Sequence, residues 1–199
     1  DDDFIDADAE PVDEDEPSAE PPDLVTTLQL LRAGESESFS ASLYYGLSGL
    51  TPDDIAEVAP VWDSLDVEYR RTLMRRMADL SETNFDLEYR TIGFLLGLDD
   101  EDAQVRENAI GLLWADETPE YMARLIEMSQ WDESALVRAA AVSALGSFIL
   151  AGELGEITES MLYQAQDVSV SIYSNETEEV EVRRRALEAI SNSSHEIVS

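Results

Sequence analysis

The sequence predicts an all-α fold built from repeated helical hairpins. Its 199 residues are enough for one domain with a substantial core, and 44% of them are hydrophobic. Apolar residues recur along most of the chain with the 3.6-residue period of α-helices. The one run that alternates in the manner of a strand, residues 168–172, lies inside a longer helical pattern, so we expect helix there as well. An arginine motif also recurs every 32 to 45 residues, which is typical of repeat proteins.

The first 23 residues are predicted to form a disordered acidic tail. They contain 12 acidic residues, four prolines and no basic residue, so they cannot bury enough apolar surface to offset the entropy lost on ordering. Residues 24–199 still carry 33 acidic residues against 12 basic ones. The acidity is therefore a property of the whole chain.

Residues 24–50 are expected to form an N-terminal helix pair that caps the fold. Leu24, Leu28 and Leu31 lie at helical spacing, and Gly34 can end this first helix because glycine readily adopts a left-handed conformation. Residues 36–50 are expected to form the second helix. Its apolar face would consist of Phe39, Leu43, Tyr44 and Leu47.

Residues 51–199 are expected to form about four hairpin repeats. Thr51-Pro52 and Thr118-Pro119 are helix starts, because threonine caps the free amides and proline at the next position needs no donor. The first helices of the hairpins are expected over 51–63, 86–97, 119–130 and 157–174. Each second helix carries Tyr-Arg or Val-Arg, followed three residues after the arginine by Leu or Ala. The motif arginines are Arg70, Arg106, Arg138 and Arg183.

Segments 99–114 and 131–146 resemble the second helix of HEAT repeats, most closely the HEAT-like variant named after phycobilisome lyases. The family pattern reads roughly Asp-x-x-x-x-Val-Arg-x-x-Ala-x-x-Ala-Leu. The resemblance covers about residues 50–199 and is most specific in the second and third repeats. It implies a right-handed α-solenoid (an α-α superhelix) of antiparallel helix hairpins, in which stacking buries the apolar face of each hairpin.

The resemblance also implies a structural ladder of arginine–aspartate pairs. Asp100 precedes Arg106 by six residues, and Asp132 precedes Arg138 by the same interval. In the family this aspartate caps its helix and bonds the arginine of a neighbouring repeat, and a bidentate pair of this kind is well suited to fixing the register.

The first and fourth repeats depart from this pattern. Ser64 and Thr177 stand where the aspartate is expected, six residues before Arg70 and Arg183. Both side chains can cap a helix, but neither carries a charge. We therefore expect that the ladder does not run through all four repeats.

The resemblance further implies that the second helices line the concave face, as they do in HEAT-like solenoids. The residues one and five positions after each motif arginine should then face the groove. These residues are Arg71, Arg75, Glu107, Gly111, Ala139, Ser143, Arg184 and Glu188. A groove that is basic at both ends and small and neutral in the middle would suit an acidic peptide or helix, or the chain's own tail. The alternative is that these arginines pair with the surplus acids nearby.

No catalytic, metal or cofactor site is predicted. The chain has no cysteine, no glycine-rich phosphate motif and no Gly-x-Ser-x-Gly elbow, and its single histidine, His195, lies near its end. Residues 99–102 are all acidic, but the glycine and glutamate of a calcium-binding loop are missing, so they are interpreted as acids at a helix start. Trp62, Trp114 and Trp131 are expected to wedge between hairpins, with ligand stacking as the alternative.

The charge limits the partners. The net charge is −33, and all 12 basic residues are arginine. Such a chain repels nucleic acids and anionic membranes, and we expect a monomer. No run of 18 apolar residues and no signal peptide is present, so we expect no membrane span and a cytoplasmic location. A GC-rich genome or adaptation to high salt would explain the acidity, and a cationic partner is the alternative.

We therefore expect a non-catalytic scaffold or adaptor that binds a protein or peptide segment on its concave face. One alternative is an accessory subunit of a bilin-lyase-like enzyme, which rests on repeat type alone and has no cysteine or other reactive group to support it. Another is a purely structural part of a longer solenoid. Residues 191–199 begin an amphipathic pattern that stops, which predicts that the solenoid continues.

Overall fold

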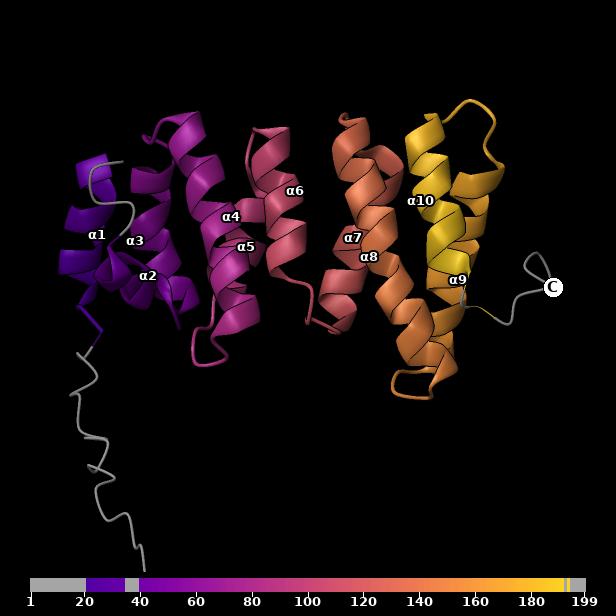
Figure 1. Ribbon diagram of the computed structural model, residues 1–199, viewed down its shortest axis with the longest axis horizontal. Coiled ribbons are helices and arrows are strands. Elements are labelled where there is room, and N and C mark those ends of the chain that lie inside the picture. The colour runs from indigo at the N-terminus through magenta and orange to yellow at the C-terminus, as the bar shows by residue number, and fades with distance from the viewer. Residues whose placement is uncertain (1–20, 35–39, 192, 194–199) are drawn as a thin grey trace, which may run out of the picture.

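The computed structural model describes residues 21–34, 40–191 and 193, and over these residues the fold is all-α, as predicted (Figure 1). Ten α-helices and one short 3₁₀ helix make up its regular structure, and the described residues contain no strand. In chain order they are α1 (Leu24–Ala33), α2 (Ala41–Leu47), α3 (Pro52–Trp62), α4 (Val67–Thr83), α5 (Arg90–Leu95), η2 (Gly97–Asp99), α6 (Ala103–Leu112), α7 (Pro119–Trp131), α8 (Ala135–Glu153), α9 (Glu159–Ser174) and α10 (Val180–Ile190).

The helices follow one another in chain order along the long axis of the molecule (Figure 1). The second helices α4, α6, α8 and α10 lie side by side across one face, and each packs extensively against the next. The first helices α3, α5, α7 and α9 contact one another much less. The α1–α2 pair lies at one end of this row, beside α3. The row therefore presents one continuous face made by α4, α6, α8 and α10.

The predicted helix starts and stops are present. Thr51 accepts a hydrogen bond from the amide of Asp54, and the Asp54 carboxylate accepts one from the amide of Thr51, which is a complete capping box before Pro52. Thr118 accepts from the amide of Tyr121 at the start of α7. α1 ends at Gly34, whose φ of 79° is costly for residues with a side chain.

The core combines the apolar faces of the second helices with buried residues of the first helices and of the α1–α2 pair. Val105 and Ala109 of α6 are completely buried, and so are Val137 and Ala141 of α8. Small residues allow close approach: a Cβ atom added to Gly146 would lie 3.1 Å from the backbone of Ala189 in α10. The apolar residues that recur with helical period on α6 and α8 are therefore the ones that are buried.

Helix α8 is the most apolar helix of the row. Among the described residues, it alone is long and apolar enough to cross a membrane by length and composition, with a mean hydropathy of 1.7 over its best 18-residue window. In this structure α8 packs against α6, α7, α9 and α10. A buried helix at the centre of a fold can be as apolar as a membrane-spanning helix. The absence of a membrane span stays a prediction.

Two helices are shorter than predicted. The expected helix 86–97 is reduced to α5 and the 3₁₀ turn η2, since Gly93 and Gly97 weaken helix formation and Tyr89, the residue before α5, supplies no side-chain cap. The helix expected over 36–50 is α2, and Phe39 lies outside the described residues. His195 and residues 1–20 of the predicted tail also lie outside them.

Candidate functional site

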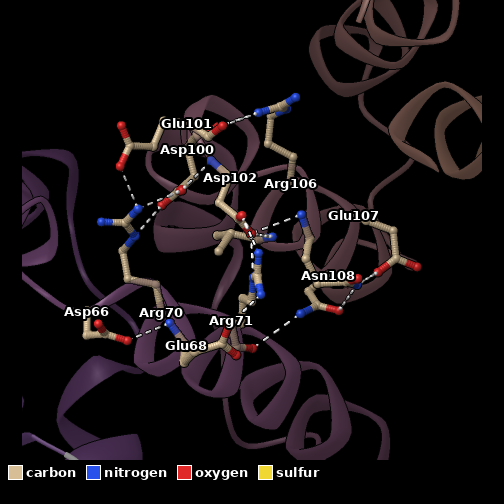
Figure 2. Close-up of polar contacts among 12 residues, drawn as sticks. Asp66, Glu68, Arg70, Arg71, Asp100, Glu101, Asp102, Arg106, Glu107 and Asn108 are labelled. Atoms are coloured by element: carbon tan, nitrogen blue, oxygen red, sulfur yellow. Dashed lines mark hydrogen bonds and ion pairs between the residues drawn. The ribbon is translucent and has the colours of Figure 1, made fainter. Parts of the chain in front are cut away.

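The first rung of the predicted ladder joins α4 to the loop before α6 (Figure 2). Arg70 Nε lies 3.0 Å from Asp100 Oδ2, and both side chains are almost fully buried. This contact is an ion pair that lacks hydrogen-bond geometry at Nε, while Arg70 Nη2 donates to Asp100 Oδ1 at 3.3 Å. Trp62 Nε1 donates to Asp100 Oδ2 at 2.7 Å. The buried carboxylate is thus held from two helices, α3 and α4.

The second rung has the ideal bidentate geometry. Arg106 donates from Nε to Asp132 Oδ2 at 2.9 Å and from Nη2 to Asp132 Oδ1 at 2.8 Å. Its Nη1 donates to the main-chain oxygens of Asp100 and Glu101. The pairing raises the pKa of Arg106. One guanidinium therefore binds both the segment between α7 and α8 and the loop that precedes its own helix.

The third rung uses a residue that the family pattern does not predict. Arg138 donates from Nε and Nη2 to the two carboxylate oxygens of Glu178, at 3.1 and 2.8 Å. The arginine in turn holds the pKa of Glu178 below its ordinary value. The expectation that the ladder lapses at the fourth repeat was therefore wrong: Glu178 follows Thr177 directly, and its longer side chain reaches the arginine.

Arg183 does not form a further rung with any carboxylate of the described residues. It donates from Nε to the main-chain oxygen of Tyr173 at 3.0 Å and lies over the ring of the same residue. The described ladder thus consists of three rungs.

The predicted caps need correction. Asp100 and Asp132 do not cap the N-termini of α6 and α8. The side chain of each accepts from the amide two residues later, where the N-caps Asp102 and Ser134 stand. Ser64 and Thr177 do not cap either. The Ser64 hydroxyl donates to the main-chain oxygen of Val61 in α3, and the Thr177 hydroxyl donates to Asn175 Oδ1. The helices that follow begin after Asp66 and Glu179. The ladder carboxylates are therefore free to turn sideways toward the neighbouring repeat.

Arg71, the first predicted groove residue, forms an ion pair with Asp102 beside the first rung (Figure 2). It donates from Nε and Nη2 to the carboxylate of Asp102 at 2.8 and 2.6 Å, and it also binds Glu68. The guanidinium, together with the amides of Val105 and Gln104, lowers the pKa of Asp102 to about 2. Arg71 thus joins α4 to the start of α6.

A groove of about 580 Å³ lies on the face of the second helices, between α6, α8, α10 and the loop after α6. We refer to it as the α6–α8–α10 groove. Its lining comprises Glu107, Ile110, Gly111, Trp114, Asp116, Glu117, Tyr121, Ala135, Leu136, Ala139, Ala140, Ser143, Ala144, Ser147, Phe148, Glu179, Glu181 and Arg185.

The structure places only part of the predicted groove residues here. Glu107, Gly111, Ala139 and Ser143 line the groove. The remaining four, Arg71, Arg75, Arg184 and Glu188, do not. On α10 the groove is lined by Glu181 and Arg185 instead of Arg184 and Glu188.

The α6–α8–α10 groove is acidic, which overturns the expectation of a basic end on α10. Five carboxylates line it, from Glu107, Asp116, Glu117, Glu179 and Glu181, against the single guanidinium of Arg185. Arg185 itself pairs with Glu181 and Glu188, and Arg184 pairs with the same two glutamates. At this end, the alternative that the arginines pair with nearby acids is correct. An acidic peptide or the chain's own acidic tail would meet repulsion here.

The floor of the groove is apolar. Ile110, Tyr121 and Phe148 are buried beneath it, whereas Trp114 and Leu136 at its rim are 54% and 45% exposed. A second hollow of about 410 Å³ continues beyond Trp114 toward the α4–α5 turn and shares Trp114, Asp116 and Glu117 with the groove. Trp114 therefore stands on the ridge between two hollows.

The tryptophans divide accordingly. Trp62 is buried against Asp100, as the core interpretation predicts. Trp114 and Trp131 are exposed, Trp131 by 78%, so the core interpretation was wrong for both. Trp114 lies two residues after the end of α6, and Trp131 is the last residue of α7.

The arrangement offers a binding surface. Within the described residues, no three histidine, cysteine or acidic side chains converge in a way that would hold a metal ion. Burial raises the pKa of Glu107, against the opposing effect of a hydrogen bond from Gln104 Nε2 at 2.6 Å.

Comparison with known proteins gives no match among family models, curated proteins or solved structures.

Proposed function

We propose that the row of helices is a HEAT-like right-handed α-solenoid and that the chain is a non-catalytic scaffold, which holds a segment of a partner protein in the α6–α8–α10 groove. The three rungs support the solenoid. In each of them an arginine of one second helix clamps a carboxylate that precedes the next, and its Nη1 donates to a carbonyl five residues before it, in the chain's own loop.

The observation that carries the function is the pair of exposed apolar side chains at the groove. Trp114 and Leu136 present large apolar surfaces to solvent directly above a floor of buried rings. Tryptophan contributes strongly to protein–protein binding because it buries a large rigid surface with little entropy loss. A hollow of this size with an apolar floor and polar rim has the anatomy of a ligand-binding cleft.

The test is to fill the groove. Gly111 lines the groove, and a Cβ atom added there meets no atom within 4 Å, so Gly111→Trp is chosen to occupy the groove with a ring. Displayed random peptides of about 16 residues, long enough for a helix of about 24 Å, are selected on the wild-type chain. We expect the selected peptides to lose at least about tenfold in affinity for Gly111→Trp, the loss of one good contact.

The matched control is Gln164→Trp. It adds the same ring at an exposed position of α9, which does not line the groove. Peptides should bind this variant as they bind the wild type. Selected peptides that bind Gly111→Trp as tightly as the wild type, or the failure of any peptide to be selected, would contradict the proposal.

A further inference from the structure

The carboxylates of the α6–α8–α10 groove are unequally compensated. Asp116 is paired with Arg90 at 2.7 Å, and Glu181 is paired with Arg184 and Arg185. These groups are already neutralised within the chain.

The other three groove carboxylates have no such partner. Among the described residues, no arginine lies within 4.0 Å of the carboxylate of Glu107, Glu117 or Glu179. Glu107 is half-buried and is held only by neutral Gln104, while Glu117 and Glu179 are exposed at the rim. A half-buried carboxylate without a cation is costly, and an incoming cation would relieve that cost.

The three carboxylates without an ion pair surround apolar surface. Glu179 is attracted by Arg138, but that arginine is already paired with Glu178. Glu107 comes from α6, Glu117 from the loop after α6 and Glu179 from the start of α10, and Trp114 and Leu136 lie on the same lining. A simple metal ion would leave this apolar surface unused, and an acidic or purely apolar ligand would leave the carboxylates unpaired. The lining therefore matches a ligand that carries both apolar groups and positive charges.

We propose that the occupant of the groove is a cationic amphipathic peptide segment, whose apolar side chains pack on Trp114 and Leu136 while its lysine or arginine side chains pair with Glu107, Glu117 and Glu179. This inference rests on the proposed function and specifies the chemistry of the partner. Charge complementarity of this kind speeds association and selects against partners of the wrong charge. Under this proposal, part of the chain's negative charge serves to recognise the partner.

The experiment compares three designed helical peptides of about 16 residues. The first has lysines on one face and leucines on the other, the second has glutamates in place of the lysines, and the third has serines in place of the leucines. Binding to the whole chain is measured by calorimetry at about 0.15 M NaCl, where the Debye length of about 8 Å suppresses general attraction by a chain of charge −33. We expect only the lysine–leucine peptide to bind tightly.

A matched pair of variants separates the groove from the general charge. The groove variant carries Glu107→Gln, Glu117→Gln and Glu179→Gln. The control carries Glu156→Gln, Glu159→Gln and Asp167→Asn, which are exposed residues outside the groove. Both remove three negative charges. The lysine–leucine peptide should lose about tenfold in affinity with the groove variant and less than about twofold with the control.

Each outcome has a distinct meaning. Equal losses in the two variants would show that the peptide is attracted by the general charge, and the inference would be wrong. Tight binding of the glutamate–leucine peptide, abolished by Gly111→Trp, would leave the proposed function standing and overturn the cationic partner. If Gly111→Trp blocks no peptide, the proposed function itself fails.

Discussion

Removal of the Arg106 guanidinium should destabilise the fold by about 3–5 kcal/mol, the cost of breaking a buried ion pair from one side. The side chains of Arg106 and Asp132 are only 10% and 9% exposed. Arg106→Ala leaves the Asp132 carboxylate in this sheltered site without its cation. It also removes the donor to the main-chain oxygens of Asp100 and Glu101. The loss therefore combines an uncompensated charge with unsatisfied carbonyls.

Arg184→Ala is the matched control. It removes the same side chain and the same charge, but Arg184 and its partner Glu181 are more than half exposed. Exposed pairs of this kind contribute little because water screens them and long side chains lose entropy on pairing. We expect a clearly smaller loss of stability for Arg184→Ala than for Arg106→Ala.

The assay is urea unfolding, followed by circular dichroism at 222 nm and by tryptophan fluorescence. Two probes are needed because stacked repeats can unfold in parts, and only coincident transitions justify a single free energy of unfolding. Arg106→Lys should recover little of the loss, since an ammonium group cannot reproduce the bidentate geometry. Equal losses for Arg106→Ala and Arg184→Ala would refute the view that the rung fixes one repeat against the next.

Two further predictions concern α6 and its surroundings. Asp102→Asn should destabilise the fold in a pH-dependent way. The loss in the free energy of unfolding should be fully present above pH 3.8 and should vanish as the pH falls to about 2, because Arg71 depresses the pKa of Asp102 in the folded state only. A loss that does not change over this range would contradict the ion pair. Gly97→Ala should cost about 1–3 kcal/mol, because its Cβ would lie 2.6 Å from the Cβ of Ala109. Gly111→Ala, where no atom lies within 4 Å of the added Cβ, should instead raise the free energy of unfolding by up to about 1 kcal/mol through helix propensity. Urea unfolding measures both variants. If both change the stability in the same direction, the packing argument is contradicted.

The ladder could be predicted from the sequence as far as its spacing is regular. Arg106 and Asp132 were identified because arginine and aspartate recur at fixed offsets. Glu178 was missed because the carboxylate lies five residues before the next motif arginine instead of six. A glutamate has one more methylene than an aspartate, so it can reach the same guanidinium from a shifted position. A search for any acid in the loop before the motif would have found it.

The groove was predicted only in its middle. Glu107 and Ser143 lie where helical periodicity places them, because α6 and α8 are regular there. Arg184 was misplaced because periodicity does not predict that it pairs with Glu181 and Glu188 along its own helix. Glu117 and Glu179 come from residues that flank helices, whose directions depend on the packing of the whole row. Periodicity assigns faces to helices, and it assigns no direction to loops.

The ladder and the acidic groove follow from the same use of arginine. The chain has 12 arginines, and the three that form rungs turn inward against carboxylates between neighbouring hairpins. Others are bound along their own helix, as Arg184 and Arg185 are. Arginines that are paired between helices or along their own helix neutralise few of the acids that face the solvent. Since Arg185, the one basic side chain at the groove, is already paired, the rim keeps its negative charge. A sequence in which arginine pairs between and along the helices therefore leaves the α6–α8–α10 groove with a surplus of carboxylates.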